Sequence, residues 1–329
     1  MPCAVRAMYV KIRKIYYNCM GNTNIMSSPY LCVYASQAAA CIGENRYKKI
    51  AEAVETFWSR ADSESYRRAM HRNNLMTNDE IVERVEKIHP AVANLLNIAS
   101  REERTSTEVS EKYAKLSSDF EKYAGDHRFP GEIAAMVDDA LRKSAYTSYG
   151  NVAESDVFKY IRDVLKVDIV EDSTFYNQPL GEVHTPYGTF KYFIGGKIDG
   201  ITRDGKTLVE IKNRVNRLFG RPPVYENIQV QTYLHLLDID KAFLVECLKC
   251  KNGGAISENV NCISINRDRA YFEMDVIPKI EGFVDLIVHL IHDESLQDKF
   301  VTSKRRNAIA AHWIKKYVDA KRRNRYALK

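Results

Sequence analysis

The chain has 329 residues, of which 45% are hydrophobic and 28% charged, and this length is enough to bury one large core or two smaller ones. No apolar run approaches the ~18 residues that a bilayer-spanning helix needs, which argues against a membrane protein. The Lys and Arg residues near the start of the sequence are not followed by an apolar stretch, so we expect no secretory signal. Seven cysteines without a framework spacing indicate reduced thiols and an intracellular location.

The formal net charge of +6 is unevenly distributed. From Ser303 to the end, ten Lys or Arg face one acid, so this segment carries +9 and residues 1–302 carry −3. Such a segment favours contact with a phosphate backbone or serves as a nuclear address, and a solvated helix face is the alternative. The cations that we expect to contact DNA are Arg305, Arg306, Lys315 and Lys316.

The first half of the chain predicts helices. Residues 1–30 form an irregular lead, and residues 31–147 form a helical N-terminal region. Ser36 to Arg60 predicts two helices interrupted near Gly43–Asn45, and Pro90 and Pro130 predict breaks in the helical block 62–145. This block is either an insertion or a cap over the site.

The second half predicts a strand-rich core at 148–300, followed by a basic C-terminal helix at 301–329. Tyr187–Gly188 marks a turn. Further strands are expected at Ala242–Glu246, Ile256–Ile265 and Tyr271–Met274, and an amphipathic helix is expected at Pro278–Leu296.

One predicted hairpin organises the chain. Its arms are Gly195–Gly200 and Leu208–Lys212, and Asp204–Gly205 supplies the turn. Side chains alternate along a strand, so Glu210 and Lys212 share a face, and Asp199 can meet Glu210 across the hairpin. Two converging carboxylates favour a hard divalent cation, and the nearby lysine suits phosphodiester cleavage. The alternative interpretation is that these charges lie on a solvent-exposed strand face beside an ordinary turn.

Two helices flank this hairpin. Asn227–Leu237 predicts a helix on which Gln229 and Tyr233 lie one turn apart on the same face. Upstream, Tyr149–Glu154 opens a helix that places Glu154 near its start, outside the apolar stripe.

The order Glu154, Asp199, Glu210–Lys212, Gln229 and Tyr233 resembles the PD-(D/E)XK nuclease superfamily, in its RecB-like and lambda-exonuclease-like branch. Tyr34–Tyr47 is similar to the amino-terminal segment of YqaJ-type viral recombinases, and Gln229–Gln231 with Asp240–Val245 fits that branch. The resemblance covers about residues 30–60 and 148–250. It implies an α/β restriction-endonuclease-like core, a central mixed β-sheet flanked by helices.

The resemblance also implies roles. Asp199 and Glu210 would hold one or two Mg²⁺ or Mn²⁺ ions with the Ile211 carbonyl, and Glu154 would complete the site. Lys212 would orient the attacking water and Gln229 would fix Lys212 or a phosphate. Tyr233 would brace its helix and is also a candidate for DNA contact. Weaker candidates for DNA contact are Ser36, Gln231 and Arg214, the last of which also suits a surface salt bridge.

The implied activity is that of a metal-dependent DNA exonuclease that resects duplex ends 5′ to 3′. A RecB-like nuclease for single strands or flaps and a non-catalytic DNA-binding scaffold are the alternatives. Ser28–Leu31 stands where relatives carry Trp or Arg, which leaves the grip on a 5′ phosphate open. A single-strand annealing protein and a homo-oligomer are implied partners, and a viral protein would work in the host cytoplasm or nucleus.

Cysteines raise one further possibility, because some RecB-like nucleases hold an iron–sulfur cluster. Cys32 or Cys41 would then act with Cys247, Cys250 and Cys262. The gap from Cys250 to Cys262 exceeds that pattern, so we expect a plain hairpin there and no cluster.

Overall fold

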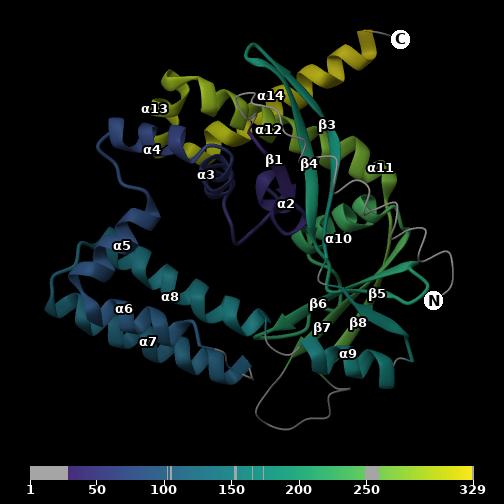
Figure 1. Ribbon diagram of the computed structural model, residues 1–329, viewed down its shortest axis with the longest axis horizontal. Coiled ribbons are helices and arrows are strands. Elements are labelled where there is room, and N and C mark those ends of the chain that lie inside the picture. The colour runs from purple at the N-terminus through teal and green to yellow at the C-terminus, as the bar shows by residue number, and fades with distance from the viewer. Residues whose placement is uncertain are drawn as a thin grey trace, which may run out of the picture.

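The computed structural model describes residues 29–101, 103, 106–151, 154–164, 166–172, 174–248 and 259–327. Two mixed β-sheets are flanked by helices, which confirms the predicted fold class of a restriction-endonuclease-like α/β core (Figure 1). The strands are divided between a three-stranded and a five-stranded sheet, whereas one central sheet was expected. The predicted irregular lead lies almost entirely outside the described residues.

The three-stranded sheet is built around β4 (Gly188–Lys197). β3 (Phe175–Thr185) pairs with it antiparallel through the turn at Tyr187–Gly188, as predicted. β1 (Leu31–Tyr34) pairs with β4 in parallel. A strand from the N-terminal region therefore completes a sheet of the predicted core.

The five-stranded sheet has its two parallel strands at the centre, β6 and β7, and the other neighbours pair antiparallel. Gly205 has a φ of 72° in the turn between β5 and β6, so the Asp204–Gly205 turn is confirmed. In spatial order the strands are β2 (Ile169–Glu171), β5 (Gly200–Thr202), β6 (Thr207–Arg214), β7 (Lys241–Leu248) and β8 (Val260–Asn266).

Helices cover both faces of this sheet. α10 (Val224–Leu237) packs with Leu208 on one face, and α9 (Glu154–Asp163) packs with Val209 and Ile211 on the other. Side chains alternate along β6, so the residues two and four positions after Leu208 point toward α10 as Leu208 does. The predicted site therefore faces the helix that carries Gln229.

A second layer of helices packs on the three-stranded sheet. The two helices expected between Ser36 and Arg60 are confirmed with their break, whereas the helix expected at 278–296 is divided at Asp293, whose carboxylate caps the second part. These helices are α2 (Ala35–Cys41), α3 (Ile50–Ala61), α4 (Ser63–Arg72), α12 (Ile277–His292), α13 (Glu294–Thr302) and α14 (Arg306–Ala327).

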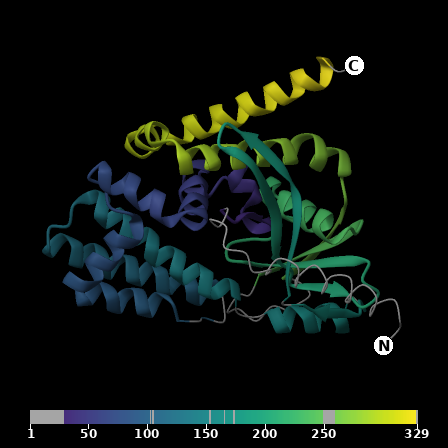
Figure 2. The same ribbon diagram turned by 45° about the horizontal axis from the view of Figure 1, so that its top comes forward.

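The remaining N-terminal helices form a group with its own apolar core (Figure 2). Pro90 opens one helix and Pro130 precedes another, so both predicted breaks are confirmed. Val215, which follows the last residue of β6, packs against this core and joins it to the central sheet. The helices are α5 (Asn78–Ile88), α6 (Pro90–Ala99), α7 (Ser106–Asp126) and α8 (Gly131–Asn151).

The predicted strand at Tyr271–Met274 is wrong. This segment is helical, with α11 (Arg269–Tyr271) followed by a π-helical turn, η2 (Phe272–Val276). The Asp268 side chain caps it by accepting from the Tyr271 amide at 2.9 Å. Phe272 and Val276 are both buried and lie one turn apart, so helical spacing prevailed over the strand-like composition. Among the described helices, none is long and apolar enough to cross a membrane.

Candidate active site

Asp199 lies where the chain passes from one sheet to the other, between the end of β4 and the start of β5. Its Oδ2 accepts a hydrogen bond from the Ile211 amide at 2.6 Å. Asp199 was expected to meet Glu210, and the contact that is seen is with the backbone of the next residue, Ile211. The residues before Asp199 belong to the three-stranded sheet, which the hairpin prediction did not foresee.

Tyr233 fixes the chain just before this crossing. Its hydroxyl donates to the Lys197 carbonyl oxygen at 2.5 Å. The ring lies so close to Gly196 that an added Cβ would come within 2.8 Å of Tyr233 Cε1. The absent side chain at Gly196 is thus what lets α10 approach the end of β4.

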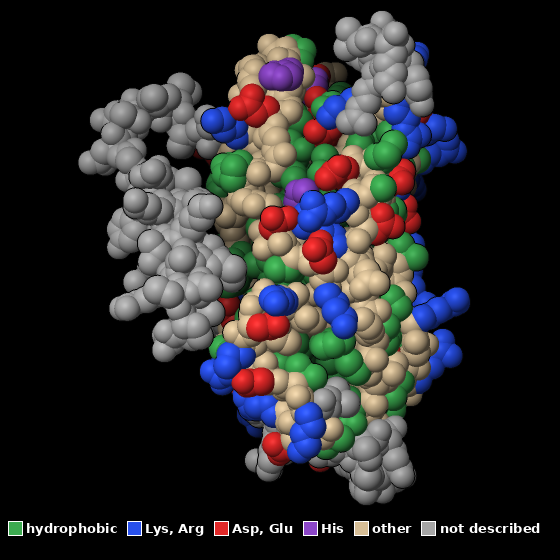
Figure 3. Space-filling view, turned by 90° about the vertical axis from the view of Figure 1, so that its right-hand side faces the viewer, with side chains coloured by type: hydrophobic (Ala, Val, Ile, Leu, Met, Phe, Trp, Pro, Cys, Tyr) green, Lys and Arg blue, Asp and Glu red, His purple; other side chains and the backbone are tan. Residues whose placement is uncertain are grey.

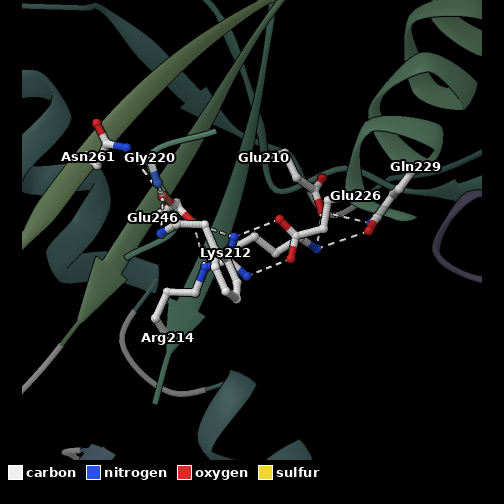
Figure 4. A network of polar contacts seen from close by, with 9 residues as sticks. Glu210, Lys212, Arg214, Gly220, Glu226, Gln229, Glu246 and Asn261 are labelled. Carbon is white, nitrogen blue, oxygen red and sulfur yellow. Dashed lines mark hydrogen bonds and ion pairs between the residues drawn. The ribbon is translucent and has the colours of Figure 1, made fainter. Parts of the chain in front are cut away.

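Glu210, Lys212 and Gln229 form a closed triangle of hydrogen bonds (Figure 4). Lys212 Nζ donates to Glu210 Oε1 at 2.8 Å and to Gln229 Oε1 at 3.0 Å. Gln229 Nε2 donates to the same Glu210 oxygen at 2.7 Å. The amide of Gln229 thereby orients both charged groups from α10, and its contact with Lys212 is the one that the family resemblance implied.

The other carboxylate oxygen of Glu210 is the unusual atom of the site. Glu210 is 3% exposed, and Oε2 is buried and accepts no hydrogen bond from the described residues. Burial raises the pKa of Glu210 to about 7, with Lys212 opposing this rise and Asp199 adding to it. A buried acceptor without a donor is costly, so this oxygen is suited to a cation from solution.

The chemistry of the donor set fits a hard divalent cation. Asp199 and Glu210 supply carboxylate oxygens, and the Ile211 carbonyl is a further oxygen on the same strand. Within the described residues, no three His, Cys, Asp or Glu side chains converge as a ready metal cluster. Glu154 begins α9, and its side chain lies outside the described ones.

Arg214, expected on the surface or against DNA, is 8% exposed and lies between two buried carboxylates (Figure 4). Its guanidinium donates to Glu226 Oε1 and Oε2 at 2.5 and 2.6 Å and to Glu246 Oε1 at 2.7 Å. Glu246 also accepts from the Phe219 and Gly220 amides, each at 3.1 Å, and thus holds the loop after β6. This network gives Arg214 a structural role and leaves it no exposed face for a substrate.

The other predicted DNA contacts are scattered. Gln231 is 2% exposed, donates to the Asn266 carbonyl and accepts from the Asp268 amide, both at 2.8 Å, so its amide holds β8 and the next segment. Ser36 is exposed in α2. Their roles in DNA contact remain predictions, and for Gln231 the structure offers packing as the explanation.

The basic C-terminal segment is a helix docked on the body. Arg306 pairs with Glu55 of α3, while Arg305, Lys315 and Lys316 are exposed. In the view of Figure 3, positive and negative side chains are intermixed over the described part, and no continuous basic track is visible there. The exposed cations of α14 therefore remain the stronger candidates for a phosphate backbone.

Two site-adjacent residues, Glu226 and Glu246, were missed. Glu246 stands in the apolar run Phe243–Cys247, where a fully buried strand seldom carries an acid, and that contrast is the signal that could have identified it. Cys247 and Cys262 lie on the paired strands β7 and β8, as the hairpin interpretation expects, and Cys250 lies outside the described residues.

Comparison with known proteins adds little. Neither a family model nor a curated protein matches the chain. Among solved structures, an alkaline exonuclease from Laribacter hongkongensis is 19% identical over 44% of this chain and 68% of its own, with a TM-score of 0.30. A phage-related exonuclease from Haemophilus somnus is 12% identical over 83% and 96%, with a TM-score of 0.28. TM-scores this low carry no argument, so the assignment rests on the geometry above.

Proposed function

We propose that this chain is a metal-dependent deoxyribonuclease that hydrolyses phosphodiester bonds at duplex DNA ends, with 5′-to-3′ polarity. The supporting observation is the buried Glu210 carboxylate, which keeps one oxygen without a donor beside Asp199 and Lys212. A structural ion pair would satisfy both oxygens. This one is left incomplete on the side where a cation would bind.

Asp199 and Glu210 would hold one or two Mg²⁺ or Mn²⁺ ions, with the Ile211 carbonyl oxygen and, by the sequence resemblance, Glu154. When bound, the ions would neutralise the carboxylates and the charge that grows on the phosphate oxygens. The Ile211 amide holds the Asp199 carboxylate in place at 2.6 Å. The two ligands therefore need no large rearrangement before they act together.

Lys212 is the residue that would contact the attacking water or the phosphate. Burial lowers its pKa, but the neighbouring Glu210 and Asp199 raise it by more, so the net pKa is raised and the ammonium stays charged at neutral pH. Gln229 holds this ammonium at 3.0 Å. A positioned cation of this kind stabilises charge that develops on phosphorus-bound oxygens.

The test is digestion of linear duplex DNA labelled at either the 5′ or the 3′ end, with Mg²⁺, with Mn²⁺ and with chelator, beside a covalently closed circle. We expect early loss of the 5′ label, a spared circle and complete inhibition by chelator. A nicked circle would instead indicate an endonuclease. Cleavage restricted to single strands or flaps would favour the RecB-like alternative.

Asp199→Ala separates catalysis from binding. This variant should lose cleavage while retaining DNA affinity measured with chelator present. Undiminished cleavage would remove the proposed site, and binding without cleavage in the unaltered protein would leave a scaffold role.

A further inference from the structure

An exposed turn between α2 and α3 presents an aromatic ring and a cation close to the site. Asn45 Oδ1 accepts hydrogen bonds from the Tyr47 and Lys48 amides at 2.8 and 3.0 Å, which fixes this turn. Tyr47 nevertheless remains 59% exposed. A fixed turn with an exposed aromatic side chain is a preorganised surface feature.

The exposed ring belongs to a small assembly. The Arg46 guanidinium lies 4.6 Å from the centre of the Tyr47 ring. Tyr47 meets Tyr225 edge to face, with ring centres 5.6 Å apart and planes at 82°. We call Arg46, Tyr47 and Tyr225 the aromatic ledge. Its stacked cation and exposed π-face are the groups that bind nucleobases without regard to sequence.

The aromatic ledge adjoins the candidate active site through α10. Tyr225 precedes Gln229 by four residues, so the two lie on one face of the helix about 6 Å apart along its axis. Gln229 in turn holds Lys212. A strand with a phosphate at Lys212 could therefore place its neighbouring bases over this ledge.

Lys48 directly follows Tyr47 in the same turn and adds a second cation beside Arg46. Burial lowers the pKa of Lys48, Cys41 and Glu52 oppose this, and Lys143 of α8 and Arg60 of α3 lower it further. The positive charge of Lys143 in α8 therefore acts electrostatically on Lys48 in this turn. Arg46 and Lys48 thus flank Tyr47 with two cations in the same turn, which suits a polyanion.

We propose that the aromatic ledge binds the unpaired bases of single-stranded DNA beside the cleavage site. The inference rests on the proposed function, because a nuclease that resects one strand leaves the other unpaired. If Tyr47 were ordinary packing, its ring would be covered. Instead the ring is supported on one side by Tyr225 and offers most of its surface to solvent.

The experiment measures binding of a short oligothymidylate that carries one 2-aminopurine, with chelator present so that nothing is cut. Tyr47→Ala should weaken the affinity about tenfold, the size expected for loss of one stacked base. Tyr47→Phe, which keeps the ring, should bind within about twofold of the unaltered protein. Quenching of the 2-aminopurine should likewise depend on the ring and not on the hydroxyl.

Abasic DNA provides the decisive control. On an abasic strand Tyr47→Ala should bind like the unaltered protein, whereas Arg46→Ala should weaken binding on both strands and flatten its salt dependence. Lys191→Ala, which removes a cation that is 71% exposed at the other end of β4, should leave affinity unchanged. Equal binding of thymidylate by Tyr47→Ala and the unaltered protein, with both folded by circular dichroism, would overturn the proposal.

The two proposals fail separately. Tyr47-dependent binding without metal-dependent cleavage would remove the nuclease and keep the ledge. Cleavage with no effect of Tyr47 on thymidylate affinity would keep the nuclease and remove the ledge.

Discussion

Strand β6 carries two buried charged clusters, and they differ in one respect. Arg214 faces two carboxylates, and Glu246 also receives two backbone amides, so the charges of this cluster are paired. Four residues earlier, Glu210 shares one oxygen between two donors and leaves the other with none among the described residues. The complete cluster is built to hold the fold, and the incomplete one is built to receive a ligand.

The largest expected effect is the loss of stability when the complete cluster loses its cation, Arg214. Arg214→Met should lower the free energy of unfolding by about 3–5 kcal/mol, because Glu226 and Glu246 are then buried without a counter-charge. Chemical denaturation with far-UV circular dichroism measures this loss. Arg203→Met removes an exposed pair with Asp168, which water and salt screen, and should change the stability far less. Equal effects of the two changes would mean that Arg214 does not stabilise the fold.

A substitution in the incomplete cluster should lower the cleavage activity and leave the stability almost unchanged. Glu210→Gln should reduce the turnover number about a hundred- to a thousandfold, since it removes a charge that acts on the reacting phosphate through the cation. The melting temperature should change little, because an amide keeps an acceptor for Lys212 and Gln229. Initial rates on end-labelled duplex, with a melting curve on the same sample, test both halves. A collapsed melting temperature with normal activity would reverse the assignment of the two clusters.

The contact behind Asp199 offers an intermediate effect. Gly196→Ala should cost about 1–3 kcal/mol of stability, because the new methyl group meets the Tyr233 ring at 2.8 Å. It should also lower activity by displacing the chain that leads into Asp199. Gly125→Ala in α7, where nothing lies within 4 Å, is the matched control and should be neutral or stabilising. Thermal melts and cleavage rates of both variants measure the difference, and matching results would show that Tyr233 does not fix Gly196.

The smallest effect is a pH dependence of cation binding. A proton and a cation compete for Glu210, whose pKa burial raises to about 7, so the protonated fraction grows as the pH falls below that value. The dissociation constant for Mn²⁺ should therefore rise up to about tenfold for each pH unit below 7 and level off above it. Isothermal titration calorimetry between about pH 6 and 8 measures this. A dissociation constant that stays flat across this range would contradict it.

Local pattern was enough to predict much of the site. The Asp204–Gly205 turn and strand alternation brought Asp199, Glu210 and Lys212 together, because each depends on near neighbours in sequence, and the family resemblance added Gln229. The same rules failed where a distant segment decides. Arg214 looks exposed until Glu246, 32 residues away, is seen to pair with it.

Sheet membership was another feature that local pattern could not supply. Gly195 looks like the arm of a hairpin, but its partners are Tyr34 and Asn177, which lie far from it in sequence. The segment Tyr271–Met274 has a strand-like composition, yet Asp268 caps it as a helix. Amino-acid composition alone does not show whether a helix cap or a strand preference decides the structure of such a segment.

The crossing of the chain at Asp199 has a mechanical consequence. Asp199 lies in the short link between the three-stranded sheet, which ends at Lys197, and the five-stranded sheet, which contains Glu210, so an ion held by both carboxylates would brace this link against the five-stranded sheet. Filling the site would then slow amide hydrogen exchange in β4 as well as in β6. The same ion that enables cleavage would brace the link between the two sheets of the core. Its loss would let each sheet open locally without the other.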